Sequence, residues 1–171
     1  MWSSSSTPIA QALCSACRRA IPSSSTTVRA QQATGSHLLR VEGYLLADKM
    51  LVAGTPIMSD EFTVGSRDWR LFFRPKGGSL TCLNGMVSAS LLHAGGSSMR
   101  DVTAECQVSI LDRAGFPAYT ASIGPQSFSS SSGAAIDMVG VKELSEAAPR
   151  LVDEDGCLNV RCDVTTLEFD E

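Results

Sequence analysis

The sequence predicts an all-β protein, an antiparallel β-sandwich of seven to eight strands with one short helix. From residue 37 onward, several runs alternate apolar and polar residues with a period of two, the pattern of strands buried on one face. Turn residues separate these runs, and no long amphipathic helix pattern interrupts them. Two sheets packed face to face best satisfy strands of this kind, because each strand can then bury its apolar side.

The expected elements can be placed in chain order. The alternation predicts strands over residues 37–46, 87–91, 102–110, 118–123 and 158–164. The run 102–110 is the clearest, because every second residue is apolar throughout. Turn chemistry at 112–115 predicts a hairpin, and Asp155-Gly156 marks a tight turn before the closing strand. Only residues 142–148 have a helical pattern, and Pro149 is expected to end that helix.

The first 34 residues differ in character from the rest. Residues 1–36 contain nine serines, four threonines and three arginines but no carboxylate. Without regularly spaced large apolar residues, such a segment cannot offset the entropy cost of ordering. We therefore expect a disordered leader over 1–34 and one folded domain over 35–171. An organelle transit peptide is the alternative for the leader, because it has the same composition; otherwise we expect the cytoplasm, the nucleus or both.

Composition excludes several classes of function. The net charge of −4 gives no reason to expect nucleic-acid binding, and no apolar run approaches the ~18–20 residues that cross a bilayer. The six cysteines follow no secretory signal, so we read them as reduced thiols. Cys14 and Cys17 have half the spacing of a zinc site, but a second pair of ligands is missing. We expect no cofactor, no metal and no enzymatic activity, because no acid, base and nucleophile are grouped.

Six short motifs, in order along the chain, resemble one known family. They are GSHLLRVEGY at 35–44, SDEFTVGSRDW at 59–69, FFRPKG at 72–77, DVTA at 101–104, SILD at 109–112 and CLNVRCDV at 157–164. Together they resemble the MATH domain, the TRAF-like β-sandwich of plant MATH-BTB (BTB/POZ-MATH, speckle-type POZ-like) ubiquitin-ligase adaptors. Within this resemblance Trp69 and Phe62 are expected to be core anchors, because large aromatics dominate buried area.

The resemblance implies a protein-binding function. In the family, the MATH domain captures a short, extended, Ser-rich peptide of a substrate protein in an aromatic groove, and the BTB domain recruits a cullin ligase for protein ubiquitination. The matching groove positions in this chain are Ser90, Cys106, Phe128, Gly133 and Ala135. Four of these five are not aromatic. Because aromatic side chains anchor interfaces, we expect a groove changed for another partner. Cys106 has a second interpretation, as a core residue of its strand.

The link to a ligase depends on a BTB domain, and no such domain follows residue 171 in this sequence. Three alternatives therefore remain open. The sequence is a fragment of a longer adaptor, a free-standing MATH protein that acts as a decoy or scaffold, or a degenerate copy that folds without binding.

Overall fold

The computed structural model describes residues 24–78, 85–95, 100–130 and 132–170. The chain divides into two compact units, Ala30–Glu168 and the two ends, Met1–Arg29 with Phe169–Glu171. The sandwich lies in the first unit. Cys14, Cys17, Cys82 and most of the expected leader lie outside the described residues, so disorder or targeting of that segment stays a prediction. The domain boundary at 34 and 35 also stays a prediction.

Nine strands in the described residues form two sheets, one or two strands more than the sequence predicted. The four-stranded sheet has the order β1 (Arg29–Val41), β9 (Leu158–Asp170), β6 (Val102–Leu111) and β7 (Pro117–Phe128). The five-stranded sheet has the order β2 (Ile57–Met58), β4 (Arg67–Arg74), β5 (Met86–His93) and β8 (Gly133–Gly140), with β3 (Phe62–Val64) paired to β4. The recorded pairings are antiparallel. The predicted all-β sandwich is confirmed.

Strand β1 begins earlier than the sequence suggested. We placed residues 29–34 in the leader, but the strand begins at Arg29. Ala33 packs against the core, and the Thr34 and Thr165 hydroxyls lie 3.2 Å apart. Pairing with the rest of the sandwich therefore orders residues 29–34, a polar stretch without large apolar side chains whose composition alone favours disorder.

The core lies between the two sheets and is centred on Trp69. Its side chain is 0% exposed, and the ring of Phe128 meets it edge-on at 5.1 Å between centroids. On β6, Val102, Ala104 and every second residue up to Ile110 are buried, as the alternation predicted. The expected burial of Trp69 is confirmed. Phe62 is only half-buried, pairs with Trp69 across β3 and β4, and stacks on His37.

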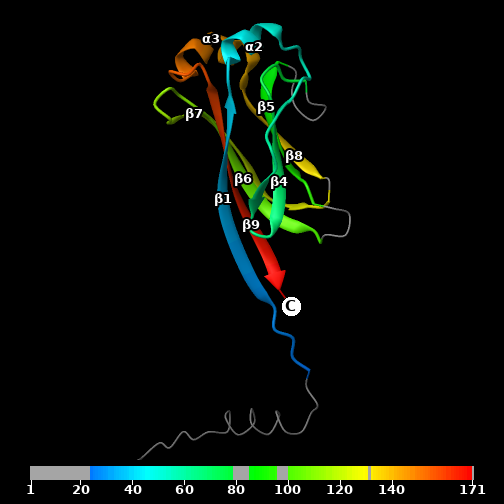
Figure 1. Cartoon of the computed structure of the whole chain (residues 1–171). Helices are drawn as coiled ribbons and strands as arrows, with labels where there is room; N and C mark the ends of the chain where they lie inside the picture. The colour runs from blue at the N-terminus through cyan, green and yellow to red at the C-terminus, as the bar shows by residue number, and fades with distance from the viewer. Residues whose placement is uncertain (1–23, 79–84, 96–99, 131, 171) are drawn as a thin grey trace, which may run out of the picture. The chain divides into compact units, whose positions relative to one another are not determined.

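Two helices in the described residues, where one was expected, lie at the same end of the sandwich (Figure 1). Helix α2 (Tyr44–Met50) occupies a stretch that the sequence suggested was partly strand. Gly43 adopts a left-handed conformation at φ 62°, which turns the chain out of β1. The following leucines, alanine, lysine and methionine favour a helix. The expectation of a strand up to residue 46 was therefore wrong.

Helix α3 (Val141–Leu151) continues past Pro149, which was expected to end it. Proline removes one backbone donor but does not end a helix if the other groups of the last turn have partners. Here Arg113 donates to the carbonyl oxygens of Pro149 and Val152, at 3.2 Å each. A cation at a helix C-terminus also interacts favourably with the helix dipole. Arg113, in the β6–β7 hairpin, thus caps the end of α3.

The predicted turns are confirmed. In the β6–β7 hairpin, the Asp112 carboxylate accepts hydrogen bonds from the backbone N–H groups of Ala114 and Phe116, and Gly115 has φ 88°. Before β9, Gly156 has φ 75°. These two turns, each with a glycine in the left-handed conformation, fix the register of the strands that follow them.

Candidate peptide-binding face

The outer face of the five-stranded sheet brings together three of the five predicted groove residues. Ser90 on β5 pairs with Ala135 on β8, and Leu92 pairs with Gly133. Because Leu91 between them is fully buried, the alternation of the strand directs Ser90 and Leu92 away from the core. Ser90 and Ala135 are half-buried and Gly133 is exposed. The three residues therefore share one accessible surface.

The structure does not place Cys106 and Phe128 on that face. Cys106 lies on β6 in the other sheet and is 4% exposed. Its thiol shares a hydrogen bond with the thiol of Cys162. This bond, together with burial, raises the pKa of Cys162, so that thiol stays protonated. Phe128 is 1% exposed and packs on Trp69. The alternative interpretation of Cys106 as a core residue agrees with this placement.

Two apolar residues outside the predicted groove set extend the face. Met58, Phe72, Ser90 and Ala135 are successive register partners across β2, β4, β5 and β8. Met58 is 54% exposed, and Phe72 is half-buried. Arg74 lies over the Phe72 ring at 5.8 Å from its centroid and donates a 3.1 Å hydrogen bond to the Ser90 hydroxyl. The face thus has an apolar half beside a half of small side chains.

A signal for Phe72 was present in the sequence. Trp69, Leu71 and Phe73 are each 0% exposed, and a period of two directs Phe72 to the opposite side. An aromatic residue that alternates with core residues is a candidate surface contact.

β8 is the last strand in the order of the five-stranded sheet. In the described part of the chain, its second edge pairs with no strand. An open edge of this kind can accept an extended peptide through backbone hydrogen bonds. The edge adjoins Ala135 and Gly133, which have small or no side chains, and β7 of the other sheet contacts β8 from its own layer.

The turn that leads into β8 is held to β5 through His93. The backbone N–H of His93 donates to the carbonyl oxygen of Ser132 at 3.0 Å. The His93 ring Nδ1 lies 3.2 Å from the carbonyl oxygen of Ser129; because a carbonyl only accepts, Nδ1 is the donor. His93 is itself buried beside Trp69, at 5.2 Å between ring centroids. The start of β8 is thereby fixed to the core.

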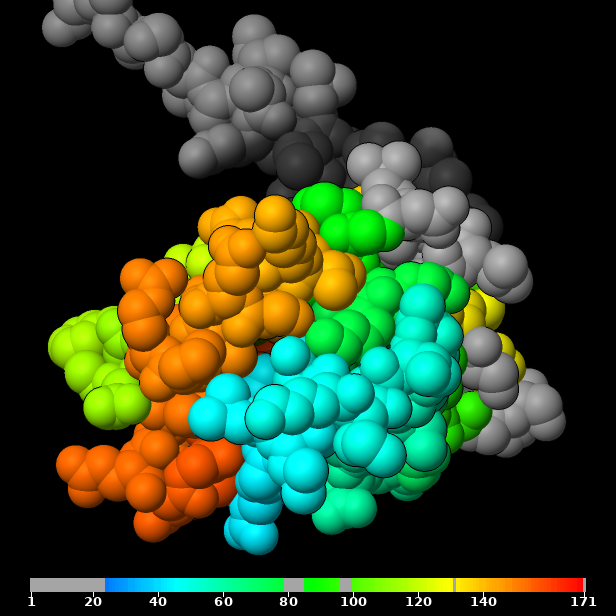
Figure 2. All heavy atoms as spheres, turned by 90° about the horizontal axis from the view of Figure 1, so that it is seen from above, coloured from blue at the N-terminus to red at the C-terminus, as the bar shows by residue number. Residues whose placement is uncertain are grey.

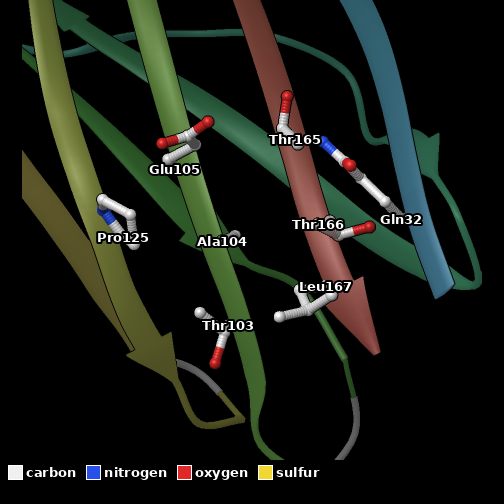
Figure 3. Close-up of a pocket in the computed structure, with 8 residues that line it drawn as sticks. All are labelled: Gln32, Thr103, Ala104, Glu105, Pro125, Thr165, Thr166 and Leu167. Atoms are coloured by element: carbon white, nitrogen blue, oxygen red, sulfur yellow. The ribbon is translucent and has the colours of Figure 1, made fainter. Parts of the chain in front are cut away.

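The outer face of the other sheet carries two adjoining hollows on either side of Glu105. One, of about 230 Å³, is lined mainly by Gln32, Thr103, Glu105, Pro125, Thr165 and Leu167 (Figure 3). The other, of about 320 Å³, is lined in part by Cys106, Ser122, Gly124 and Asp163. The Asp163 carboxylate accepts hydrogen bonds from Arg161 and Ser36. These two hollows form a second, separate surface on the sandwich.

Within the described ranges, no group of three or more His, Cys, Asp or Glu residues could hold a metal ion. Cys106, Cys157 and Cys162 are free and buried. No described helix has both the length and the apolar character needed to cross a membrane. The expected absence of enzymatic activity stays a prediction.

Comparison with known proteins agrees with the sequence motifs. No family model matches the chain. BTB/POZ and MATH domain-containing protein 3 of Arabidopsis thaliana is 34% identical over 95 residues, which cover 56% of this chain and 22% of that protein. Protein 4 of the same name is 37% identical over 98 residues, or 56% of this chain and 20% of that protein. Protein 6 is 35% identical over 94 residues, or 55% of this chain and 22% of that protein.

The matched stretch thus spans about a fifth of the length of these relatives. It covers rather more than half of this chain, whose described residues form the all-β sandwich that the motifs implied. The resemblance of this chain to the BTB/POZ and MATH domain-containing proteins is therefore confirmed.

Proposed function

We propose that this domain is a protein-interaction module that captures a short extended peptide of a partner on the outer face of the five-stranded sheet. The observation that carries the proposal is the in-register row Met58, Phe72, Ser90 and Ala135, which ends at the open edge of β8. The similarity to MATH domain-containing proteins supports a function of this class.

The proposed mode of binding is strand addition. Backbone groups of the peptide pair with the outer edge of β8, and alternate side chains of the peptide contact the sheet face. Because β8 begins at a turn fixed by His93, its edge is already ordered before binding. Pre-ordering reduces the entropy cost of association.

The residues of the face indicate which peptide side chains fit. Ser90, Gly133 and Ala135 have small side chains, so the peptide must supply the bulk at this point. An added strand at β8 itself lies about 14 Å from β4, so a flanking segment of the peptide that crosses the sheet face would bring a large apolar side chain against Phe72 and Met58. Arg74, already bonded to Ser90, can donate a further hydrogen bond to a hydroxyl, carbonyl or carboxylate oxygen of the peptide. We therefore propose a peptide with one large apolar residue and an acceptor group near it.

The role in protein ubiquitination belongs to the same proposal and needs a BTB domain. Joined to such a domain, as in the relatives named above, the sandwich would select the protein presented to a cullin ligase. Acting by itself, it would be a decoy or scaffold that holds the same partner without that outcome.

The test is selection of peptides from a phage-displayed random library on the full chain, followed by binding measurements with the enriched peptides. Ser90→Arg and Ala135→Asp place bulky or charged groups on the proposed face. Gln107→Arg is the matched control, because Gln107 is exposed on β6 in the other sheet. Thermal melting of each variant confirms that it is folded.

We expect Ser90→Arg and Ala135→Asp to weaken binding about tenfold or more and Gln107→Arg to leave it within roughly twofold. Binding that is lost only with Gln107→Arg would place the site on the four-stranded sheet. A folded chain that enriches no peptide would contradict the proposal and support a degenerate copy.

A further inference from the structure

Helix α2 presents apolar side chains to solvent. Leu45, Leu46 and Met50 are 40%, 70% and 76% exposed, and Val52, just after the helix, is 68% exposed. In a surface helix of a globular protein, the exposed side is ordinarily polar and the apolar stripe faces the core. Clustered exposed apolar residues of this kind mark interaction sites. In Figure 2 the segment that contains α2 (cyan) is open at this end of the sandwich, beside α3 (orange).

The inner side of the same helix is polar and tightly held. Asp48 forms an ion pair with Lys76 at 2.7 Å, and the Ser145 hydroxyl of α3 donates to Asp48 at 3.3 Å. The Tyr44 hydroxyl also donates to Asp48, at 3.5 Å, from a fully buried side chain. Burial and the neighbouring Asp48 carboxylate raise the pKa of Tyr44, so it remains neutral. These contacts fix which side of α2 faces outward, so the apolar side is an ordered surface.

Two opposite charges flank the exposed leucines. Glu42 lies just before the helix and Lys49 lies in its last turn, and both are exposed. Neither forms an ion pair with another described residue. Along the chain, the midpoint between positions 42 and 49 falls between Leu45 and Leu46. A two-fold axis at that midpoint would bring Glu42 of one copy against Lys49 of the other, twice.

We propose that α2 is a self-association site, at which two copies of this chain pair their α2 helices antiparallel across a two-fold axis. The apolar side chains of Leu46 and Met50 would pack against those of the second copy, with the two Glu42–Lys49 pairs at the rim. An isologous contact needs a surface complementary to itself, and both the apolar centre and the flanking charges meet that condition.

The size of the surface sets the expected strength. A seven-residue helix with three exposed apolar side chains, followed by the exposed Val52, offers much less than the ~800 Å² per partner of a standard interface. We therefore expect a reversible dimer with a Kd on the order of 0.1–1 mM. Such an interface becomes significant when another part of an assembly holds two copies close together, because a linked contact acts at high local concentration.

Sedimentation equilibrium of the full chain, between micromolar and millimolar concentrations, tests the proposal. Leu46→Glu should raise the dimer Kd about tenfold or more. Phe116→Glu is the matched control, because Phe116 is an apolar side chain of similar exposure, 69%, that lies outside α2, in the β6–β7 hairpin. That control should dimerise like the parent.

The decisive arm uses charge reversal. Glu42→Lys and Lys49→Glu should each abolish self-association, because each places like charges together at both ends of the helix pair. An equimolar mixture of the two variants should dimerise again, since both contacts then join opposite charges. This mixed dimer should weaken as the salt concentration rises.

A parent chain that stays monomeric at about 1 mM, or a mixture that fails to associate, would overturn the proposal. Self-association that survives Leu46→Glu would place the interface elsewhere.

Discussion

Replacement of Trp69 by alanine tests how far the sandwich depends on one side chain. The indole is 0% exposed and is contacted edge-on by Phe128 and at a tilt by His93. It lies on the central part of the five-stranded sheet, where β4 pairs with both β3 and β5. The neighbouring strands cannot close over the vacated space, because backbone pairing holds them on both sides.

The expected cost follows from this packing. Truncation of a buried aromatic to alanine lowers the free energy of unfolding by about 3–5 kcal/mol. A domain of this size has roughly 5–15 kcal/mol in total. Trp69→Ala should therefore lower the melting temperature by roughly 10 °C or more, or leave the domain unfolded.

Trp69→Phe is the informative companion. The indole Nε1 is buried and has no hydrogen-bond partner among the described residues. Its removal therefore leaves no acceptor without a donor, and phenylalanine keeps most of the apolar contact. We expect Trp69→Phe to cost clearly less than Trp69→Ala, by urea and thermal unfolding followed with far-UV circular dichroism. An alanine variant that melts within about 2 °C of the parent would show that Trp69 is not a core anchor.

Two further variants test local features of the fold. Burial lowers the pKa of His37, whose ring stacks on Phe62 at 4.4 Å between centroids. The free energy of unfolding should therefore fall as the pH drops below about 6.5. His37→Phe should remove that pH dependence in urea titrations between pH 7.5 and 5.5. Gly77 has φ +66°, and an added Cβ would lie 2.3 Å from the Met86 carbonyl oxygen. Gly115 has φ +88° but open space around it, so Gly115→Ala should cost only the ~1–2 kcal/mol of a left-handed backbone, and Gly77→Ala should destabilise more. Equal losses of the free energy of unfolding in denaturant titrations would show that the clash at Gly77 is relieved.

The strands and their buried faces could be predicted from the sequence wherever the local apolar alternation matches the burial in the folded sandwich. Over 102–110 of β6 and 158–164 of β9, each second residue is apolar and buried, so a period-two pattern was sufficient there. The turns at Asp112 and Gly156 could be predicted equally well, because these residues act locally. Trp69 was predicted to be core because a large aromatic residue in such a pattern rarely has another place.

Helix α2 could not be predicted in the same way. Its outward side is apolar and its inward side holds Asp48, whose partner Lys76 lies far along the chain. This reverses the pattern by which amphipathic helices are recognised. Helix α3 continues past Pro149, and Arg113 caps its end through a contact that only the folded chain creates.

Three of the five predicted groove residues lie together in the structure. Ser90, Gly133 and Ala135 share one face because β5 pairs with β8, a strand that the period-two alternation did not predict. Transfer of the groove to Cys106 and Phe128 conflicted with the burial that their own strands favour, and both side chains lie in the core. Phe72 was missed because the motif at 72–77 indicated a strand but did not show which residue of a neighbouring strand lies beside Phe72.

The most direct test of the proposed binding face is an amide chemical-shift map of the ¹⁵N-labelled full chain, titrated with an enriched peptide. Strand addition at β8 should give the largest shifts along Gly133–Gly140 and at Phe72 and Ser90 across the sheet. Shifts that cluster instead around Glu105 and Thr165, between the two hollows of the four-stranded sheet, would contradict the proposed binding face.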